Sequence, residues 1–384
     1  MGKFSKSAVV GAAAILLVVG VGLSAGYMPK TLEIGATAPD FDLPGVDGRN
    51  YKLSDFTDSE ILVVIFTCNH CPTARAYEER IKKLTADYID KDVAVVAISS
   101  NDPCALRLDE MAWSDVGDSL EDMKIRAKDK EFNFPYLYDG DTQKVAKIYG
   151  PVTTPHTFIF DKERKLRYVG RIDNSEWKEK PNAVHDARNA IDALLAGQKV
   201  RVKKTKTFGC SIKWSDKRTS VKKERKQLAK ERVTVEMIDT KGIKELVKNN
   251  KDKLRLINVW ASWCGPCKIE LPELVEIYWI YRNRRTTEFE LVTISTDPTK
   301  YRKGVLSFLK EYHASCKNYL FDSGDIYQLI EAVDEEWPGA IPYTILVEPG
   351  GKIIYRQMGL IEPLELKKAI VGYYAGTLPW WVRE

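Results

Sequence analysis

The feature that most constrains the fold is a pattern that occurs twice along the chain: an apolar run, a Cys-x-x-Cys pair and a helix-like segment. The first copy is residues 61–66 followed by Cys68-Asn69-His70-Cys71, and the second is residues 254–260 followed by Cys264-Gly265-Pro266-Cys267. Each apolar run is short and β-rich, which predicts a buried strand, and the spacing after each pair is helical. Strands that alternate with helices in this way indicate an α/β layered domain. With 384 residues, the chain is long enough for two such domains in tandem.

Both copies continue with the same order of predicted elements. In the first domain we expect a hairpin near residues 38–48, strands over 61–66, 93–98, 157–160 and 166–169, and helices over 73–88, 120–130, 142–149 and 183–195. In the second we expect strands over 254–260, 289–294, 343–347 and 353–355, and helices over 272–284, 303–312, 326–333 and 365–374. The predicted boundaries are 30–198 for the first domain, 199–232 for a basic linker and 233–384 for the second domain.

Residues 1–29 have the layout of a targeting segment. Lys3 and Lys6 precede an uncharged stretch over 7–28, and Ser24-Ala25-Gly26 offers small residues at which a signal peptidase can cut. The apolar run also approaches the ~20 residues that span a bilayer, so an uncleaved N-terminal membrane anchor is a close rival to a signal peptide. Both interpretations predict an exported protein, either periplasmic or membrane-anchored and facing the extracytoplasmic side, where dithiols can cycle or rest oxidised.

The sequence Trp263-Cys264-Gly265-Pro266-Cys267 is the most specific signal for chemistry. A strand that ends before Cys264 and a helix that starts after it place this thiol at a helix N-terminus, where the helix dipole favours the attacking thiolate. Cys267 lies one helical turn further on and can resolve a mixed disulfide. The alternative, a zinc site, needs two further ligands, and this domain offers no second Cys-x-x-Cys or close histidine pair. We therefore expect no metal and no cofactor.

This motif, with Ile341-Pro342 downstream, resembles the thioredoxin superfamily, whose members have a cis-proline facing the dithiol. The run from Cys267 to Pro272 is similar to the TlpA/ResA-type exported thioredoxins, which implies that Glu270 lies near the dithiol and accepts a proton from Cys267. Cytoplasmic thioredoxins have a buried aspartate where this chain has Asn258, which favours Glu270 as the base. A surface position for Glu270 on the helix is the alternative. The resemblance further implies that Trp263, Ile341 and Pro342 contact substrate chains.

The first domain resembles the peroxiredoxin-like redoxins of the AhpC/TSA class. The resemblance is carried by Ala38-Pro39-Asp40-Phe41, by Cys71-Pro72-Thr73 and by Thr154-Pro155-His156. It aligns Cys71 with the peroxidatic cysteine, but the position three residues earlier, where that family needs Thr or Ser, is Cys68, and no peroxide-binding arginine is identifiable. Thr154 and Pro155 correspond to Ile341 and Pro342 of the second domain, and the resemblance implies that they contact substrate.

These departures favour disulfide exchange in the first domain, with Cys68 as nucleophile and Cys71 as resolver. His70, also counted among the substrate-contacting residues, would favour the thiolate and make this dithiol more oxidising than the Gly-Pro pair. The alternatives are a static disulfide or a soft-metal site with His70 or His156. The remaining cysteines, Cys104, Cys210 and Cys316, are interpreted as buried or incidental thiols.

The basic segment 199–232 contains 14 Lys or Arg against three acids, which indicates a solvated linker that ends in a charged helix. Its apolar run 208–214 predicts docking on the first domain. The expected partners are client proteins with disulfides or thiols and an unidentified thiol electron donor. A tether to the membrane at the N-terminus is possible, and we expect no nucleic acid partner. The predicted fold class is α/β, with two tandem thioredoxin-like domains, each a central mixed sheet flanked by helices. The predicted function is an exported thiol–disulfide oxidoreductase; the rivals are a thiol peroxidase reduced by the second domain, and a first domain that is a non-catalytic binding scaffold.

Overall fold

The computed structural model describes residues 29–283 and 288–377 of the chain. The first half contains these elements: β1 (Asp42–Pro44), β2 (Asn50–Lys52), η1 (Leu53–Phe56), β3 (Ile61–Thr67), α1 (Pro72–Ala76), α2 (Glu78–Tyr88), β4 (Val93–Ser99), η2 (Pro103–Ala105), η3 (Asp109–Trp113), α3 (Leu120–Asp129), β5 (Tyr136–Tyr138), α4 (Lys144–Tyr149), β6 (Thr153–Thr154), β7 (His156–Phe160), β8 (Leu166–Gly170) and α5 (Asp186–Leu195).

A connecting segment follows, with β9 (Cys210–Ser211), η4 (Ser215–Lys217) and α6 (Arg218–Leu228). The second half contains β10 (Glu236–Ile238), α7 (Thr240–Lys248), β11 (Lys253–Trp260), α8 (Gly265–Tyr281), β12 (Glu288–Ser295), η5 (Thr299–Tyr301), α9 (Arg302–Glu311), β13 (Lys317–Phe321), α10 (Ile326–Val333), β14 (Tyr343–Val347), β15 (Ile353–Met358) and α11 (Pro363–Thr377).

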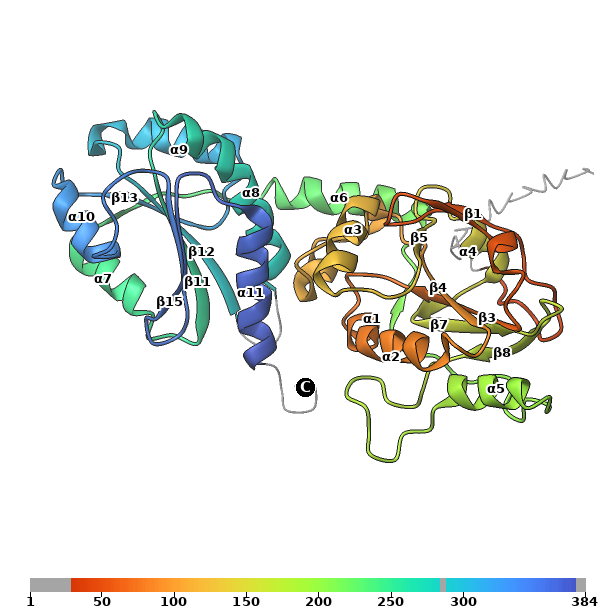
Figure 1. Ribbon diagram of the computed structural model, residues 1–384. Coiled ribbons are helices and arrows are strands. Elements are labelled where there is room, and N and C mark those ends of the chain that lie inside the picture. Colours follow the sequence, from red (N-terminus) through yellow and green to blue (C-terminus); the bar gives the residue numbers. More distant parts are fainter. Residues whose placement is uncertain (1–28, 284–287, 378–384) are drawn as a thin grey trace, which may run out of the picture.

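Each half is built on its own central sheet, and α6 runs between the two (Figure 1). The first sheet has the strand order β5-β4-β3-β7-β8, and the second has the order β10-β13-β12-β11-β14-β15. In both, the strand before the cysteine pair lies at the centre, with a parallel neighbour on one side and an antiparallel neighbour on the other. The two mixed sheets flanked by helices confirm the predicted fold class.

The central strands are apolar throughout because both of their faces are covered. Odd-numbered residues of β3 from 61 to 65 lie in one hydrophobic cluster, and even-numbered residues from 62 to 66 lie in the other. The same division holds for β11, whose two faces contribute to separate clusters. Each such buried aliphatic side chain stabilises the fold by about 1.5–3 kcal/mol, which holds the end of the strand, and hence the first cysteine after it, in place.

The element boundaries differ from the predictions in three places. The predicted helix over 73–88 is two helices, α1 and α2, which meet at Tyr77. The helix after the second dithiol continues through Pro272 and does not begin there. The strands β5, β10 and β13 were not predicted, because three-to-five-residue strands carry too few alternations to be read from periodicity. The helix α7 was also not predicted.

The segment predicted as a solvated linker is mostly exposed, but its middle part is packed against the first domain. Ile212 and Trp214 are buried in a core cluster of that domain, as the apolar run 208–214 led us to expect. Residues 210–211 form β9, which pairs antiparallel with β6. Only the charged helix α6 resembles the predicted linker, and it too is anchored, because Arg218 pairs with Asp102 of the first domain and Arg225 pairs with Glu276 of the second.

The two domains also share a packed interface. Leu108 and Ala112, on either side of the start of η3, belong to the same apolar cluster as the α8 side chains of the second domain. The Tyr281 hydroxyl at the end of α8 donates a 2.8 Å hydrogen bond to the carbonyl of Ser114. The Ser114 hydroxyl in turn donates to the carbonyl of Asn69, inside the first Cys-x-x-Cys spacer, at 3.2 Å. The second dithiol helix is therefore linked through two hydrogen bonds to the loop that holds the first.

The predicted targeting segment, 1–29, lies outside the described residues except for its last position. Within 29–283 and 288–377, no helix is both long enough and apolar enough to cross a membrane.

Candidate active site

In the second domain the dithiol lies at the start of α8. Cys264 is the N-cap of this helix, and its sulfur accepts a 3.3 Å hydrogen bond from the backbone N–H of Cys267. The two cysteines form a disulfide, with their Cα atoms 5.3 Å apart. Both are buried, Cys267 more fully than Cys264. The helix N-terminus offers free N–H groups and a positive dipole end, which favour a thiolate at Cys264 in the reduced state.

Glu270 is a buried carboxyl group, one helical turn after Cys267. Its side chain is 2% exposed; Oε1 accepts a hydrogen bond from the Asn258 amide at 2.7 Å, and Oε2 accepts one from the backbone N–H of Ile361 at 3.1 Å. Burial raises the pKa of Glu270 to about 7, although both hydrogen bonds act in the opposite direction. The alternative of a surface glutamate is therefore wrong. The i, i+3 spacing places Glu270 and Cys267 on the same face of the helix.

The predicted substrate-contacting residues of this domain lie next to Cys264, either in sequence or across from it in the fold. The Ile341–Pro342 peptide bond is cis, as the resemblance implied. The carbonyl oxygen of Ile341 lies 3.9 Å from the Cys264 sulfur. Trp263, directly before the first cysteine, is 68% exposed, while Ile341 is half-buried and Pro342 is buried. An exposed indole beside a partly covered sulfur is an arrangement that a polypeptide can contact.

In the first domain the helix cap is Cys71, not Cys68. Cys71 precedes α1 with φ −73° and ψ 121°, close to the φ −79° and ψ 113° of Cys264, and its sulfur accepts a 3.4 Å hydrogen bond from the N–H of Ala74. Both cysteines also come four residues after the last residue of the central strand. The geometry thus corrects the expected alignment: Cys71 corresponds to Cys264, and the position of the resolving Cys267 is occupied by Ala74.

The first-domain thiols face the cis-proline segment. The Thr154–Pro155 bond is cis. The Cys68 sulfur lies 3.1 Å from the Thr154 hydroxyl, and the Cys71 sulfur lies 3.4 Å from the Thr154 carbonyl oxygen. Both thiols are reduced in this structure, and both are buried. Thr154 thus contacts both thiols, in the way that Ile341 contacts Cys264.

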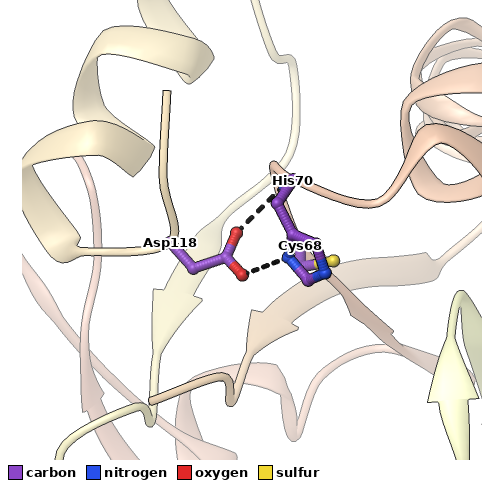
Figure 2. Close-up of side chains that lie close together, drawn as sticks. All are labelled: Cys68, His70 and Asp118. Atoms are coloured by element: carbon purple, nitrogen blue, oxygen red, sulfur yellow. Dashed lines mark hydrogen bonds and ion pairs between the residues drawn. The ribbon is translucent and has the colours of Figure 1, made fainter. Parts of the chain in front are cut away.

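His70 is engaged by an aspartate that the sequence did not reveal (Figure 2). Its Nδ1 atom lies 2.5 Å from the Oδ2 atom of Asp118, and its backbone N–H donates to Oδ1 of the same carboxylate at 3.1 Å. Asp118 also accepts from the N–H of Asn69 at 2.8 Å, so one carboxylate holds the whole spacer. Burial by itself lowers the pKa of His70, but the ion pair with Asp118 reverses this effect and raises the pKa above its ordinary value.

The two first-domain thiols differ strongly in acidity. Burial raises the pKa of Cys68 well above its ordinary value. Burial also raises the pKa of Cys71. Hydrogen bonds from Cys210 and Cys68 and the positive charge of His70 together lower it by more than burial raises it, so that the net pKa lies well below the ordinary value. Cys71 is therefore the more acidic of the two thiols. His156 carries no positive charge here, because burial lowers its pKa to about 4 and leaves it neutral.

Three residues expected to contact clients are covered in the first domain. His70, Thr154 and Pro155 are all buried. The backbone of Thr154, which would be the pairing edge for a substrate chain, is paired with Cys210 of this chain's own β9. His70 is enclosed because its ring is held by Asp118 beneath the spacer. In this conformation these residues line an internal site, and their contact with client proteins stays a prediction.

A metal could be held in the first domain only by a small set of ligands. Cys68, His70 and Asp118 offer ligand atoms within 4.8 Å of one another. The Nδ1 atom of His70 is already bonded to Asp118, and the Cys68 sulfur lies 3.1 Å from the Thr154 hydroxyl, which leaves the unpaired Nε2 atom of His70 as the free ligand atom in that set. A structural zinc site takes four ligands, so the set falls short of one. His156, the other ligand considered from the sequence, accepts from the N–H of Val152 instead.

Sequence reasoning missed two members of this site. Asp118 lies 48 residues from His70 in the chain and in no motif, so only the fold brings it there. Cys210 was interpreted as an incidental thiol, although its N–H donates to the Cys71 sulfur at 3.3 Å. The apolar run around Cys210 was the one available signal. Of the other single cysteines, Cys104 is exposed, and Cys316 is buried in the same apolar cluster as Cys264 and Cys267, where its sulfur donates to Asn318.

Comparison with known proteins agrees with this geometry. The profile of the AhpC/TSA family matches residues 34–169 and again residues 219–356. The thiol-disulfide oxidoreductase ResA of Bacillus cereus is 26% identical over 157 residues, which are 41% of this chain and 82% of that protein. The thiol:disulfide interchange protein HelX of Rhodobacter capsulatus is 28% identical over 126 residues, 33% of this chain and 63% of that protein. These names confirm the predicted enzyme class, a thiol–disulfide oxidoreductase.

Among solved structures, a hypothetical protein from Sinorhizobium meliloti is 35% identical, with a TM-score of 0.43, and covers 49% of this chain and 98% of its own. The AhpC/TSA profile covers both sheets and both cysteine pairs and accounts for well over half of the residues. The chain therefore belongs to the AhpC/TSA family of the thioredoxin superfamily and carries its domain twice.

Proposed function

We propose that the protein is an exported thiol–disulfide oxidoreductase that acts on protein disulfides or thiols through two redox centres. The observation that carries the proposal is the second dithiol: Cys264 caps α8, is bonded to Cys267, and lies beside Ile341 and the exposed Trp263. Support for export comes from the charge pattern of residues 1–29, which have the layout of a signal peptide or membrane anchor.

The second domain in its reduced form would attack a client disulfide with the Cys264 thiolate. One client sulfur then leaves as a thiolate, and the other is held in a mixed disulfide with Cys264. Cys267 next attacks the Cys264 sulfur, which releases the second client thiol and regenerates the Cys264–Cys267 disulfide. Trp263 would provide an apolar surface for the client chain, since its indole is solvent-exposed directly before the nucleophile.

Glu270 would accept the proton that Cys267 must lose before it attacks. A group with a pKa of about 7 is half ionised at neutral pH, which suits both uptake and release of a proton. Asn258 supports this role because its amide fixes one carboxylate oxygen. In the oxidised protein the same carboxyl group would return the proton when Cys267 is reduced.

In the first domain we assign the nucleophilic role to Cys71 and make Cys68 its disulfide partner. This reverses the order suggested by the Cys-x-x-Cys motif alone. It rests on the helix-cap position of Cys71, its lowered pKa and its proximity to the charged His70. A stabilised thiolate favours the reduced form, so the first dithiol is expected to be the more oxidising of the two centres.

A glutathione redox titration of the full-length protein tests this function, with each cysteine's state read by differential alkylation and mass spectrometry. We expect the Cys264–Cys267 pair to titrate near the ~−270 mV of thioredoxin and the Cys68–Cys71 pair well above it. Replacement of Cys264 by Ser should abolish reduction of a disulfide-containing protein, whereas replacement of the exposed Cys104 by Ser should not. If the first pair never changes state, the first domain is a binding scaffold and only the second is an enzyme.

A further inference from the structure

The first domain lacks a resolving cysteine at the position where the second domain has one. Ala74 stands at the third residue after the helix cap, where Cys267 stands after Cys264. The Cys71 sulfur instead has thiols on two other sides. Cys68 comes from the end of the central strand, and Cys210 comes from β9 in the segment between the domains. Cys68, Cys71 and Ala74 form one small buried cluster, and the partly buried Cys210 packs against it.

The backbone of Cys210 is held in place by hydrogen bonds to Cys71 and to Thr154. Its N–H donates to the Cys71 sulfur at 3.3 Å, and its carbonyl accepts from the Thr154 hydroxyl at 3.4 Å. The strand pairing matches Cys210 with Thr154, the residue before the cis-proline. The approach is close enough to require glycine at the preceding position, because a Cβ on Gly209, whose φ is +124°, would lie 2.0 Å from the Thr154 carbonyl oxygen.

Access to solvent differs sharply among the three thiols. Cys68 is 3% exposed and Cys71 is 0% exposed, whereas Cys210 is partly exposed. Burial alone does not exclude a client protein from the first pair, because Cys264, the nucleophile proposed for the second domain, is itself only 5% exposed. The first pair differs because Cys210 packs against the Cys71 sulfur. The pairing edge at Thr154 is also occupied by β9. The first dithiol therefore has no direct route to a large partner except past Cys210.

We propose that Cys210 is a third redox-active thiol, which carries the first-domain disulfide from the buried Cys68–Cys71 pair to the surface. The Cys210 sulfur attacks the Cys71 sulfur of the Cys68–Cys71 disulfide and loses its proton as it does so. The hydrogen bond to Cys71, which is the largest cause of the raised pKa of Cys210 in the reduced site, is lost once Cys71 is in a disulfide. The Cys71–Cys210 bond forms and the Cys68–Cys71 bond breaks. The proton lost by Cys210 ends on Cys68, so the number of disulfides and of electrons is unchanged. This proposal rests on the redox role given to the first domain above.

The partner of Cys210 is then a protein dithiol. One client thiolate attacks the Cys210 sulfur and displaces the Cys71 thiolate, which the helix N-terminus and His70 stabilise as a leaving group. The second client thiol attacks the resulting mixed disulfide and releases Cys210. Two electrons and two protons pass from the client to the first domain, and the client gains a disulfide. The high pKa of Cys68 agrees with its part in this sequence, since it ends as a neutral thiol.

The first test is a disulfide map of the full chain with Cys68 replaced by Ser. After oxidation with glutathione disulfide and tryptic digestion without reductant, we expect peptide 53–75, which contains Cys71, to be joined to peptide 207–213, which contains Cys210. Glutathione on Cys71 together with a free Cys210 thiol would overturn the proposal. In the unaltered chain, the Cys68–Cys71 disulfide lies within peptide 53–75 and is distinguished by its mass.

The second test is kinetic and compares matched single-cysteine variants. In Cys210→Ser, we expect the rate at which a reduced protein dithiol reduces the Cys68–Cys71 disulfide to fall roughly tenfold or more, because exchange depends on access to the sulfur. Cys104→Ser, which removes a single exposed thiol of the same domain, should retain the original rate. Gly209→Ala keeps every cysteine but displaces β9, and it should lose rate in the same way if the variant folds.

The outcomes separate this proposal from the function on which it rests. If the Cys68–Cys71 disulfide forms in no glutathione buffer, the redox role of the first domain is wrong. If that disulfide forms normally, and Cys210→Ser exchanges with the protein dithiol as fast as Cys104→Ser does, the first domain is a redox centre but Cys210 is not its relay.

Discussion

Replacement of Glu270 by Gln should stabilise the second domain increasingly as the pH rises. The folded protein holds a proton on this carboxyl group up to about pH 7, whereas the ordinary value is 4.5. Folding therefore becomes less favourable as the pH rises from 4.5 through 7, since the unfolded chain releases its proton first. The difference of about 2.5 pKa units corresponds to about 3 kcal/mol, most of it between pH 5 and pH 8, at about 1.4 kcal/mol per unit.

The glutamine variant lacks this titration, so its stability should not decline in that range. The glutamine side chain has one acceptor oxygen and one NH2 group, so its NH2 group faces either the Asn258 amide or the Ile361 N–H, which are both donors. This loss of one hydrogen bond lowers the stability of the variant by about 1 kcal/mol at every pH. The informative quantity is thus the change with pH in the difference between the two proteins. We expect the variant to gain about 2–3 kcal/mol relative to the parent between pH 5 and pH 8.

Urea unfolding of the oxidised proteins at a series of pH values measures this difference. Tryptophan fluorescence reports mainly on the second domain, because six of the nine tryptophans lie in 233–384. Glu273→Gln is the control, since that side chain is exposed on the same helix. A constant difference between Glu270→Gln and the parent across the range would refute the reasoning, because it would mean that Glu270 ionises alike in the folded and unfolded chains.

Further predictions concern the two redox centres and their connection. Cys267→Ser should accumulate a mixed disulfide between Cys264 and a client, visible on non-reducing gels. If this variant forms no mixed disulfide after exposure to an oxidised client, Cys264 is not the nucleophile. Asp118→Asn should lower the pKa of His70 and weaken the adjacent thiolate, so that the first dithiol becomes less oxidising by roughly 30 mV, a tenfold change in its equilibrium with glutathione; an unchanged or higher potential would contradict this. Tyr281→Phe should loosen the contact between the domains by about 1 kcal/mol, measured as faster proteolysis between them, and unaltered cleavage would show that this hydrogen bond contributes nothing.

Much of the fold and of the second site could be predicted from the sequence, because both depend on local patterns. The apolar run before Cys264 and the helical spacing after it are enough to place this thiol at a helix cap. Glu270 was identified through the resemblance to the TlpA/ResA-type thioredoxins, and the structure places it one helical turn after Cys267. The short strands β5, β10 and β13 were missed because so few residues show no periodicity.

The first site could not be predicted to the same depth, since its members come from distant parts of the chain. The Cys-x-x-Cys spacing suggested Cys68 as the cap, whereas the strand β3 continues to Thr67 and the helix begins only at Pro72, which leaves Cys71 as the cap. The Asp118 carboxylate that charges His70 and the β9 strand that covers Thr154 arrive through tertiary contacts.

The sequence by itself determined that the chain forms two thioredoxin-like domains with two cysteine pairs, because strand, cap and helix signals act over a few neighbouring residues. Only the tertiary structure decided which thiol of the first pair is the acidic one and which third thiol lies beside it. The physical reason is that burial, ion pairing and strand pairing depend on residues such as Cys71, Asp118 and Cys210, which are up to 139 positions apart in the chain and meet only when the sheet is assembled.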